Sequence, residues 1–440
     1  MPRSGPARID PRRMSRFHHA IYNLLVRAAQ PLLRRKLRRR AAAEPGYGLS
    51  VEERFGVYSQ PVEPRSELVW VHAVSLGESR AAGVLLAALR SAMPGVRVLL
   101  THGTATGRAE GERYLRAGDV QVWQPWDTPA AVRAFLHHFK PRVGLLMETE
   151  VWPNLVWQSR HARVPLALVN ARMSGKSLRS ALRWAGLMRP VFVGLSQVWA
   201  QTDADAQRLR ALGAQVQAIT GNLKFDAQPD PAQVARAQTW RKGLSRPVVM
   251  LASSREGEEA LWLQAVQSHV QSQVQMLIVP RHPQRVDEVE RLLRDAGWQV
   301  SRRSQWGEAG PCAAHSHAVW LGDTLGEMAL YYSLADVALL GGSFAPLGGQ
   351  NLIEAAACAC PVVMGPHTFN FAEVAEQALA AGAAWRVEDM RQAFARVQEL
   401  LRPESSHTLA LAKEKARDFA RAHQGAAART AALVRSLLAE

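Results

Sequence analysis

The sequence predicts an α/β protein with two Rossmann-like domains that face each other across a cleft. From residue 67 onward, short apolar runs alternate with glycine-bearing or polar turns and with helical stretches. A polar stretch at 226–243 interrupts this rhythm once, and the rhythm then restarts. The chain has 440 residues, more than one hydrophobic core usually organises. Strands that alternate with helices form parallel sheets with right-handed crossovers, so each series predicts one doubly wound domain.

The N-terminal segment, residues 1–45, carries most of the positive charge. The formal net charge is +16, and residues 1–40 hold twelve Lys/Arg against one acid, Asp10. The apolar run at 17–33 is too short and too polar for a confident transmembrane span, and no signal-peptide cleavage site follows it. Its apolar residues recur at helical spacing, which predicts an amphipathic helix on an anionic membrane surface. The alternative is a helix docked on the protein's own body, followed by a solvated basic tail.

Twelve apolar runs are interpreted as strands. In the first domain, 46–228, they lie at 68–74, 96–101, 120–126, 143–147, 165–170, 197–202 and 216–221. In the second domain, 229–405, they lie at 247–252, 275–280, 319–322, 337–341 and 361–365. Residues 406–440 read as one or two alanine-rich helices. Three cysteines form no disulfide framework, which fits a reducing compartment.

Ligands of open α/β sheets bind outside the carboxyl ends of the strands, so residues just after each run are site candidates. Glu78 follows the first run at the start of a helix; alternatively, it only suits the helix dipole there. Glu148 and Glu150 follow the fourth run, and two carboxylates at that place are costly unless they are paired or functional. Lys224 would either neutralise an acidic ligand or pair with Asp226.

In the second domain, the candidates suit a phosphate. Arg281 in Pro280-Arg-His-Pro283 presents a guanidinium fork at a strand end. The glycine-bearing turns at 322–327 and 341–354 both lead into helices. Free N–H groups at the start of the second of these helices would cradle a phosphate, and Glu354 could accept ribose hydroxyls.

Other motifs point away from competing chemistries. The pair Asp203 and Asp205 looks like a metal-binding Asp-x-Asp, but its place before a helix favours capping, so no metal site is predicted. The chain has neither a P-loop nor a Gly-x-Ser-x-Gly hydrolase motif.

From about residue 54 to 371, the chain resembles the 3-deoxy-D-manno-octulosonic acid (Kdo) transferases of Gram-negative lipopolysaccharide synthesis. The resemblance rests on eight strings in this order: His72-Ala-Val-Ser-Leu-Gly-Glu78, Met147-Glu-Thr-Glu-Val-Trp-Pro-Asn154, Asn170-Ala-Arg172, Asn222-Leu-Lys-Phe-Asp226, Pro280-Arg-His-Pro283, Gly322-Asp-Thr-Leu-Gly-Glu327, Gly341-Gly-Ser343 and Gly365-Pro-His-Thr-Phe-Asn-Phe371. Arg255 and Gln350 depart from it, because they stand where the family commonly has histidine.

The resemblance implies a GT-B fold and transfer of Kdo from CMP-Kdo to a tetraacylated lipid A precursor (lipid IVA), with inversion, at the cytoplasmic face of the inner membrane. It implies that Glu78 is the general base and that Glu148 and Lys224 stabilise the transition state, without a cofactor or metal. The residues that it implies for the CMP part are Pro280, Arg281, Leu325, Gly326, Glu327, Asn351, Leu352, Ile353 and Glu354.

Two other classes of protein remain open at this point. One is a GT-B transferase that uses a UDP- or GDP-sugar. The other is a non-enzymatic basic protein that binds nucleic acid or membrane, whereas the prediction is an enzyme with no nucleic-acid partner. Deletion of residues 1–45 separates the two: an enzyme should keep its active site for water-soluble acceptors, and a binding protein should lose all activity.

Overall fold

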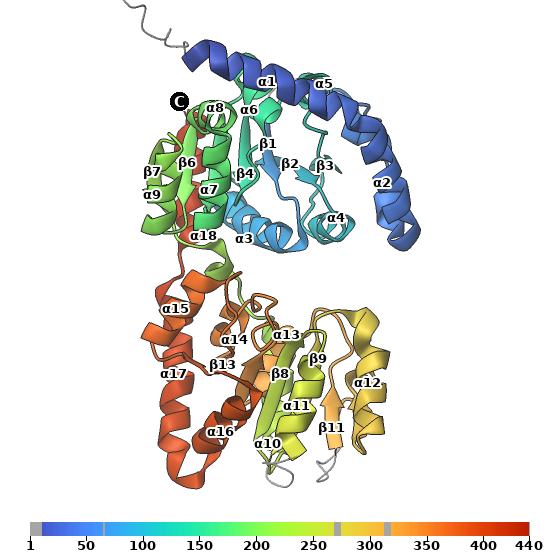
Figure 1. The fold of residues 1–440 in the computed structure, drawn as a ribbon, viewed down its shortest axis with the longest axis vertical. Coiled ribbons are helices and arrows are strands. Elements are labelled where there is room, and N and C mark those ends of the chain that lie inside the picture. The colour runs from blue at the N-terminus through green and yellow to red at the C-terminus, as the bar shows by residue number, and fades with distance from the viewer. Residues whose placement is uncertain (1–10, 65–66, 268–273, 312–317, 440) are drawn as a thin grey trace, which may run out of the picture. The chain divides into compact units, whose positions relative to one another are not determined.

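The computed structural model describes residues 11–64, 67–267, 274–311 and 318–439. The chain forms two compact units: unit 1 comprises Met1–Asp226 with Gln424–Glu440, and unit 2 comprises Ala227–His423 (Figure 1). Each unit contains one seven-stranded sheet whose strands pair in parallel, with helices on its faces. The predicted α/β class with two Rossmann-like sheets is confirmed. Residues 1–10 of the predicted basic segment lie outside the described residues.

The sheet of unit 1 has the order β3-β2-β1-β4-β5-β6-β7. Its strands are β1 Leu68–His72, β2 Arg97–His102, β3 Val120–Trp123, β4 Val143–Met147, β5 Leu166–Ala171, β6 Gln197–Ala200 and β7 Val216–Ile219. All seven were predicted. The central strands β1, β4 and β5 are buried at every residue, as continuous apolar runs in a parallel sheet require. The strand order reverses between β1 and β4, which is where such folds place their ligands.

Helices cover both faces of this sheet. They are α3 Leu76–Ala92, α4 Ala105–Glu112, α5 Pro129–Phe139, α6 Pro153–His161, α7 Gly175–Arg183, α8 Ala185–Val193, α9 Asp203–Ala211 and α18 Ala426–Ala439, with a 3-10 turn, η3, at Leu223–Asp226. Trp70 and Phe135 anchor the core on one face, and Leu85 and Trp199 anchor the core on the other.

The C-terminal segment is divided between the units. Its first helix, α17 (Ser406–Ala422), belongs to unit 2, whereas α18 packs against α3 through Ala427, Ala431 and Val434. Asp226 holds the start of α18 because its carboxylate accepts hydrogen bonds from the backbone N–H groups of Gly425 and Ala427. The sequence treats 406–440 as one segment; these contacts separate its two helices.

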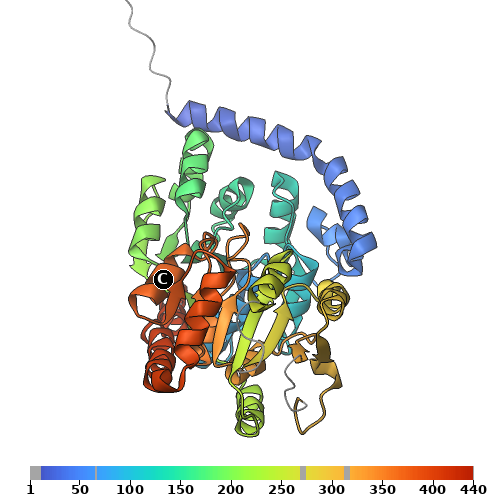
Figure 2. The ribbon, with the colours of Figure 1, turned by 60° about the horizontal axis from the view of Figure 1, so that its bottom comes forward.

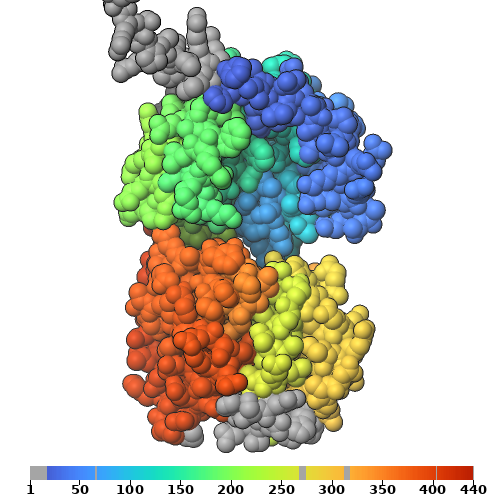
Figure 3. Space-filling model, viewed as in Figure 1, coloured from blue at the N-terminus to red at the C-terminus, as the bar shows by residue number. Residues whose placement is uncertain are grey.

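The N-terminal segment folds into α1 (Pro11–Ala28) and α2 (Gln30–Ala43), followed by short 3-10 turns η1 (Pro45–Gly48) and η2 (Val51–Phe55). Figures 1 and 2 show α1 along the outside of unit 1, and Figure 3 shows both helices as a surface ridge. One side of α1 docks on the body, where it contacts α8. The other leaves Phe17, Leu24 and Leu25 between 62% and 69% exposed. The docked side agrees with the alternative interpretation of this helix, and the exposed apolar side is where the predicted contact with a membrane surface would lie. Among the helices of the described residues, none is both long and apolar enough to cross a bilayer.

Unit 2 has the strand order β10-β11-β9-β8-β12-β13-β14. Its strands are β8 Val248–Ser254, β9 Gln275–Pro280, β10 Gln299–Arg302, β11 Ala318–Leu321, β12 Val337–Leu340, β13 Val362–Met364 and β14 Ala384–Arg386. Its helices are α10 Pro231–Lys242, α11 Glu258–Gln267, α12 Val286–Asp295, α13 Met328–Leu334, α14 Ile353–Ala357, α15 Ala372–Ala380, α16 Met390–Leu401 and α17. The five predicted strands are present, and the two that the prediction missed, β10 and β14, are the two edges of the sheet.

Candidate active site

The candidate residues of unit 1 share one edge of its sheet. Because β1, β4 and β5 are parallel neighbours, their carboxyl ends meet at this edge. Glu78 follows β1, Glu148 follows β4 and Arg172 follows β5. The structure thus brings together Glu78 and Glu148, which the rule of strand ends selected from distant parts of the sequence.

Glu78 occupies the first turn of α3, as the sequence predicts. Ser75 is the N-cap, and its Oγ accepts a hydrogen bond of 3.3 Å from the backbone N–H of Glu78. The Glu78 carboxylate completes the capping box, because its Oε2 accepts a hydrogen bond of 3.4 Å from the N–H of Ser75. The same oxygen accepts a hydrogen bond of 2.6 Å from the N–H of Val74. The helix-terminal interpretation of Glu78 is therefore correct for its resting contacts.

The Glu78 carboxylate also has the properties of a group that accepts a proton, in addition to its role as a helix cap. Glu78 is only 8% exposed, and burial raises its pKa to about 7, with further increments from the negative charges of Glu150 and Glu148. The hydrogen bonds from Val74 and Ser75 oppose this rise but do not cancel it. All hydrogen bonds to this carboxylate from the described residues end on Oε2. A glutamate whose pKa lies near neutral pH and whose second oxygen carries no such bond is suited to accept a proton.

Glu148 is held in an ion-pair cluster. Its Oε1 lies 2.8 Å from Nζ of Lys224, and its Oε2 lies 2.7 Å from Nε of Arg172. Burial acts to raise the pKa of Glu148, but the charges of Lys224 and Arg172 outweigh it and keep that pKa below its ordinary value. The backbone of Glu148 has a φ of +53°, a left-handed conformation that costs a non-glycine residue free energy. The carboxylate is thus kept ionised and fixed in place.

The structure shows which carboxylate pairs with Lys224. It pairs with Glu148, 76 residues away, and not with Asp226, whose carboxylate binds the start of α18. The Lys224 side chain remains 22% exposed, so solvent or a ligand can reach it. The suggested local pair is therefore wrong, and the lysine belongs to the acidic cluster.

Two further residues join this cluster that were not among the site residues implied by the resemblance. Arg172 stands directly after β5, and its side chain is 48% exposed while it holds Glu148. Glu150 accepts a hydrogen bond of 2.9 Å from Nε1 of Trp152, and its pKa is raised by burial and by the charge of Glu148. Their positions just after β5 and β4 are the signal that could have identified them.

Asp203 and Asp205 lie in the first turn of α9, as the capping interpretation expects. The N-cap residue is Thr202, and Asp205 accepts a hydrogen bond from its hydroxyl at 2.8 Å. The other oxygen of Asp205 accepts from the backbone N–H of Met173 at 2.7 Å. These contacts give Asp205 a role at the helix start.

In unit 2, the predicted residues also follow the ends of strands. Pro280 ends β9, and the exposed Arg281 is fixed by its backbone N–H, which donates to the carbonyl oxygen of Ser254 at 3.0 Å. After β11, Leu325 is 80% exposed, and Gly326 has a φ of +81° with open space around its Cα. Glu327 already forms an ion pair within the protein, because its Oε1 lies 2.8 Å from the guanidinium of Arg303.

The loop after β12 differs from the expected phosphate cradle. Its N–H groups at Gly342, Phe344 and Ala345 donate to the buried carboxylate of Glu258, at 2.6, 3.0 and 3.3 Å. Burial raises the pKa of Glu258, and these hydrogen bonds oppose the rise. Part of the loop therefore already holds an internal anion, which the sequence did not reveal because Glu258 lies 84 residues before Gly342.

The end of this loop provides the remaining predicted residues. Asn351 accepts a hydrogen bond from the backbone N–H of Ile353 at 3.1 Å, and this bond begins α14. Leu352 and Ile353 are buried, whereas Glu354 is partly exposed. The expected helix is present, but since α14 has only five residues, its dipole is small.

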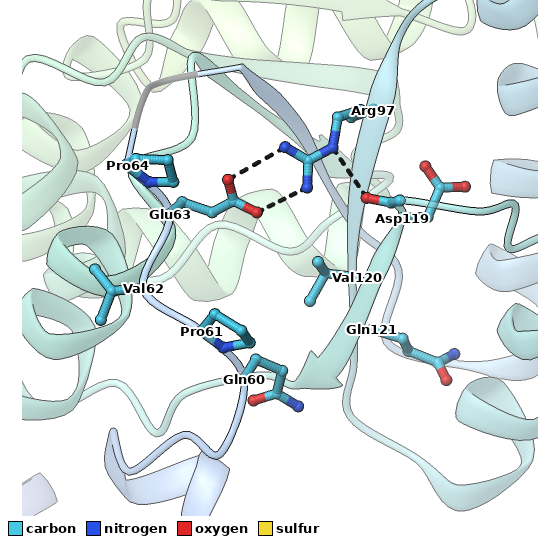
Figure 4. Close-up of a pocket in the computed structure, with 10 residues that line it drawn as sticks. Gln60, Pro61, Val62, Glu63, Pro64, Arg97, Asp119, Val120 and Gln121 are labelled. Atoms are coloured by element: carbon cyan, nitrogen blue, oxygen red, sulfur yellow. Dashed lines mark hydrogen bonds and ion pairs between the residues drawn. The ribbon is translucent and has the colours of Figure 1, made fainter.

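A cavity of about 470 Å³ lies elsewhere in unit 1 (Figure 4). Glu63, Arg97 and Val120 are among its lining residues, and Glu63 forms an ion pair of 2.8 Å with Arg97. Arg97 and Val120 are the first residues of β2 and β3, so this cavity lies at the amino ends of those strands. It is therefore at the opposite edge of the sheet from Glu78 and Glu148, and we assign it no part in the chemistry.

Solved structures show the class of this fold. A glycosyltransferase from Rickettsia africae is similar to 86% of this chain and to 100% of its own length, with a TM-score of 0.56 at 12% sequence identity. Two parallel-sheet units of this kind define a GT-B fold.

Sequence comparison gives the family. Residues 50–227 match the family described as 3-deoxy-D-manno-octulosonic-acid transferase (kdotransferase). A 3-deoxy-D-manno-octulosonic acid transferase of Bordetella pertussis is 48% identical over 424 residues, which are 93% of this chain and 97% of that protein. The enzyme of the same name from Haemophilus influenzae is 29% identical over 86% of this chain and 90% of its own. The chain belongs to the 3-deoxy-D-manno-octulosonic acid (Kdo) transferase family.

Proposed function

We propose that this protein transfers Kdo from CMP-Kdo to a lipid A precursor, with inversion and with Glu78 as the general base. The observation that carries the proposal is the pair of unlike carboxylates at one sheet edge. Burial raises the pKa of Glu78 to about 7, whereas Glu148 is held ionised by Lys224 and Arg172. Two carboxylates whose environments separate their pKa values suit two different roles in one reaction.

The chemistry assigns a role to each group. The acceptor hydroxyl oxygen forms a bond to the anomeric carbon of Kdo, the bond from that carbon to the phosphate oxygen breaks, and CMP leaves as an anion. The hydroxyl proton passes to Oε1 of Glu78, which the capping box leaves available. The positive charges of Lys224 and Arg172, anchored by Glu148, stabilise the negative charge that develops in the transition state. Attack on the side opposite CMP inverts the anomeric configuration.

For the CMP part of the donor, we propose the strand-end turns of unit 2. Arg281, the turn 325–327 and the segment 351–354 follow β9, β11 and β12, which run parallel in one sheet. Arg281 offers a guanidinium to the phosphate. Gly326, with open space where a side chain would stand, lets a ligand approach the backbone.

The decisive experiment is incubation of the purified protein with CMP-Kdo and the tetraacylated lipid A precursor. A mass increase of the lipid by one or more Kdo units, with release of CMP, is the expected result. Turnover with a UDP- or GDP-sugar in place of CMP-Kdo would contradict the proposed donor. The same products from Glu78→Gln at the wild-type rate would contradict the proposed base.

We propose further that the protein works at the anionic cytoplasmic face of the inner membrane, which the nature of the acceptor and the exposed apolar side of α1 support. A second basic surface supports this location. Residues 151–202 contain seven Lys/Arg and no Asp or Glu. Three of these cations, Lys176, Arg179 and Arg183, lie within about 60° on α7, which has no buried residue, and Trp184 next to it is 63% exposed.

Binding to vesicles of phosphatidylglycerol and phosphatidylcholine tests this location. Each Lys/Arg near an anionic surface contributes about 1 kcal/mol, so neutralising three should weaken binding up to about 100-fold. The variant replaces Lys176, Arg179 and Arg183 with Gln. Its control replaces the exposed Arg391, Lys415 and Arg417 of unit 2 with Gln and removes the same charge. An equal loss of binding in both variants would contradict a local contact of α7.

A further inference from the structure

Helix α1 is bonded to the first turn of α6 by side chains that the proposed reaction does not use. Tyr22 donates from its hydroxyl to Oδ2 of Asp127 at 2.7 Å. One turn earlier, Nε2 of His19 lies 2.9 Å from Oδ1 of Asn154. The His19 ring also packs on Trp157, with 4.6 Å between the ring centroids. These contacts come from the docked side of α1, opposite the exposed apolar side chains.

Asp127 serves as the cap of α6 from another part of the chain. The N-cap residue of α6, Trp152, makes no capping hydrogen bond with its own side chain. Instead, the Asp127 carboxylate accepts from the backbone N–H groups of Asn154 at 3.0 Å and Leu155 at 2.8 Å. The Asn154 amide returns a bond of 2.6 Å to the carbonyl oxygen of Asp127. Asp127 and Asn154 are 8% and 0% exposed, so the network is shielded from water.

The start of α6 fixes one end of the acidic turn. Only residues 148–152 connect β4 to α6, and this short turn contains Glu148 and Glu150. At the other end, the backbone N–H of Glu148 is bonded to the carbonyl oxygen of Val169 at 3.0 Å. The turn is held between the sheet and the first turn of α6, so a shift of α6 moves both carboxylates.

We propose that Tyr22, His19 and Asp127 are positioning residues that fix the acidic turn 148–150 through the first turn of α6. The N-terminal helix is then part of the framework of the active site as well as a membrane-associating segment. This inference rests on the proposed function of Glu78 and Glu148. It reverses one expectation from the sequence: deletion of residues 1–45 should impair turnover even with a water-soluble acceptor.

The test is the substitution Tyr22→Phe in the full chain, which removes one hydroxyl and keeps the ring. We expect kcat to fall about tenfold, less than the ~100-fold that a 1 Å misplacement of catalytic groups can cause. CMP affinity and vesicle binding should stay at the wild-type level. The matched control is Tyr58→Phe, because the Tyr58 hydroxyl is buried in unit 1 without a hydrogen-bond partner among the described residues. Its kcat should not change.

The pH profile separates positioning from general loss of structure. The charges of Glu150 and Glu148 help raise the pKa of Glu78, and Glu148 is itself paired with Lys224 and Arg172. If the acidic turn moves away, the pKa of Glu78 falls, and the acidic limb of the kcat/KM profile shifts to lower pH. Partial unfolding would instead lower kcat/KM by the same factor at every pH and would leave the position of the acidic limb unchanged. Asp127→Asn, which keeps the side-chain shape, should produce the same shift with a larger loss of kcat.

Three outcomes overturn the proposal: an unchanged kcat for Tyr22→Phe, a loss shared equally by Tyr58→Phe, or a loss that follows vesicle binding alone. A parallel measurement of Glu78→Gln keeps the two hypotheses apart. If Glu78→Gln turns over normally, the proposed base is wrong. If Glu78→Gln is inactive and Tyr22→Phe is normal, only the positioning role is wrong.

Discussion

In unit 1 the candidate residues are charged side chains that the fold removes from water, whereas in unit 2 they are mostly surface turns. Glu78 and Glu148 are 8% and 2% exposed. Burial, and then the charges of Glu150 and Glu148, raise the pKa of Glu78, whereas Lys224 and Arg172 keep the pKa of Glu148 below its ordinary value. In unit 2, Leu325 is 80% exposed, and the most buried carboxylate of the site region, Glu258, holds backbone N–H groups in place. Low dielectric surroundings strengthen electrostatic interactions, which supports our proposal that unit 1 carries the chemical step and that unit 2 recognises the donor.

The sharpest test of this contrast is Glu78→Gln. The change removes the base but leaves an amide oxygen that can still accept from the N–H of Val74, so α3 should stay capped. We expect kcat to fall by about 10²–10⁴-fold and CMP affinity to stay unchanged. A fall of less than about tenfold would remove Glu78 from the role of base.

The pH dependence of the wild-type enzyme tests the same residue. A general base must be deprotonated before the reaction, and burial raises the pKa of Glu78 to about 7. The kcat/KM for CMP-Kdo, measured at saturating acceptor, should therefore rise as the pH increases through about 7. A rate that is already maximal at pH 5 would contradict this assignment.

The next largest effect is expected for Lys224→Met, which removes one of the two cations on Glu148. The remaining Arg172 leaves this carboxylate with less opposing charge, so the pKa of Glu148 should rise. We expect kcat to fall about 100-fold, as measured by release of CMP. Lys242→Met, an exposed lysine of α10, is the control and should retain full activity.

For unit 2, Glu258→Gln tests whether a buried carboxylate has a structural role. An amide in its place sets N–H groups against the N–H groups of the loop after β12. The free energy of unfolding should fall by about 1–3 kcal/mol, with weaker CMP binding and a kcat that changes little at saturating donor. Glu256→Gln, two residues earlier and exposed, should change stability by no more than about 0.5 kcal/mol. Equal effects would contradict the assigned role.

The smallest effect is expected for Arg281→Ala. Loss of one charge-assisted hydrogen bond to the phosphate should weaken CMP binding about tenfold, measured by titration calorimetry. Arg391→Ala, an exposed arginine of α16, should bind CMP like the wild type. A large fall in kcat with normal CMP affinity would move Arg281 from recognition to the chemical step and would break the contrast between the units.

The alternation of strands and helices, and the edge of each sheet that carries polar residues, could be predicted from the sequence alone. This follows because buried parallel strands need continuous apolar runs, which are visible without a structure. The two strands that the prediction missed have no such run. β10 (Gln299–Arg302) has no fully buried residue and β14 (Ala384–Arg386) has three residues, and both are edge strands that need not be apolar on both faces.

Which charged residues form ion pairs, by contrast, could be learned only from the three-dimensional packing of the chain. Lys224 has a nearby acid in the sequence, yet it pairs with Glu148 because the fold places the ends of distant segments together. In the same way, Asp127 caps a helix that starts 26 residues later, and Tyr22 reaches it from α1. The pKa of Glu78 depends on burial and on Glu150, neither of which a local pattern contains. Local patterns report the periodicity of burial, but electrostatic partners depend on distances in space, which the packing of the chain sets.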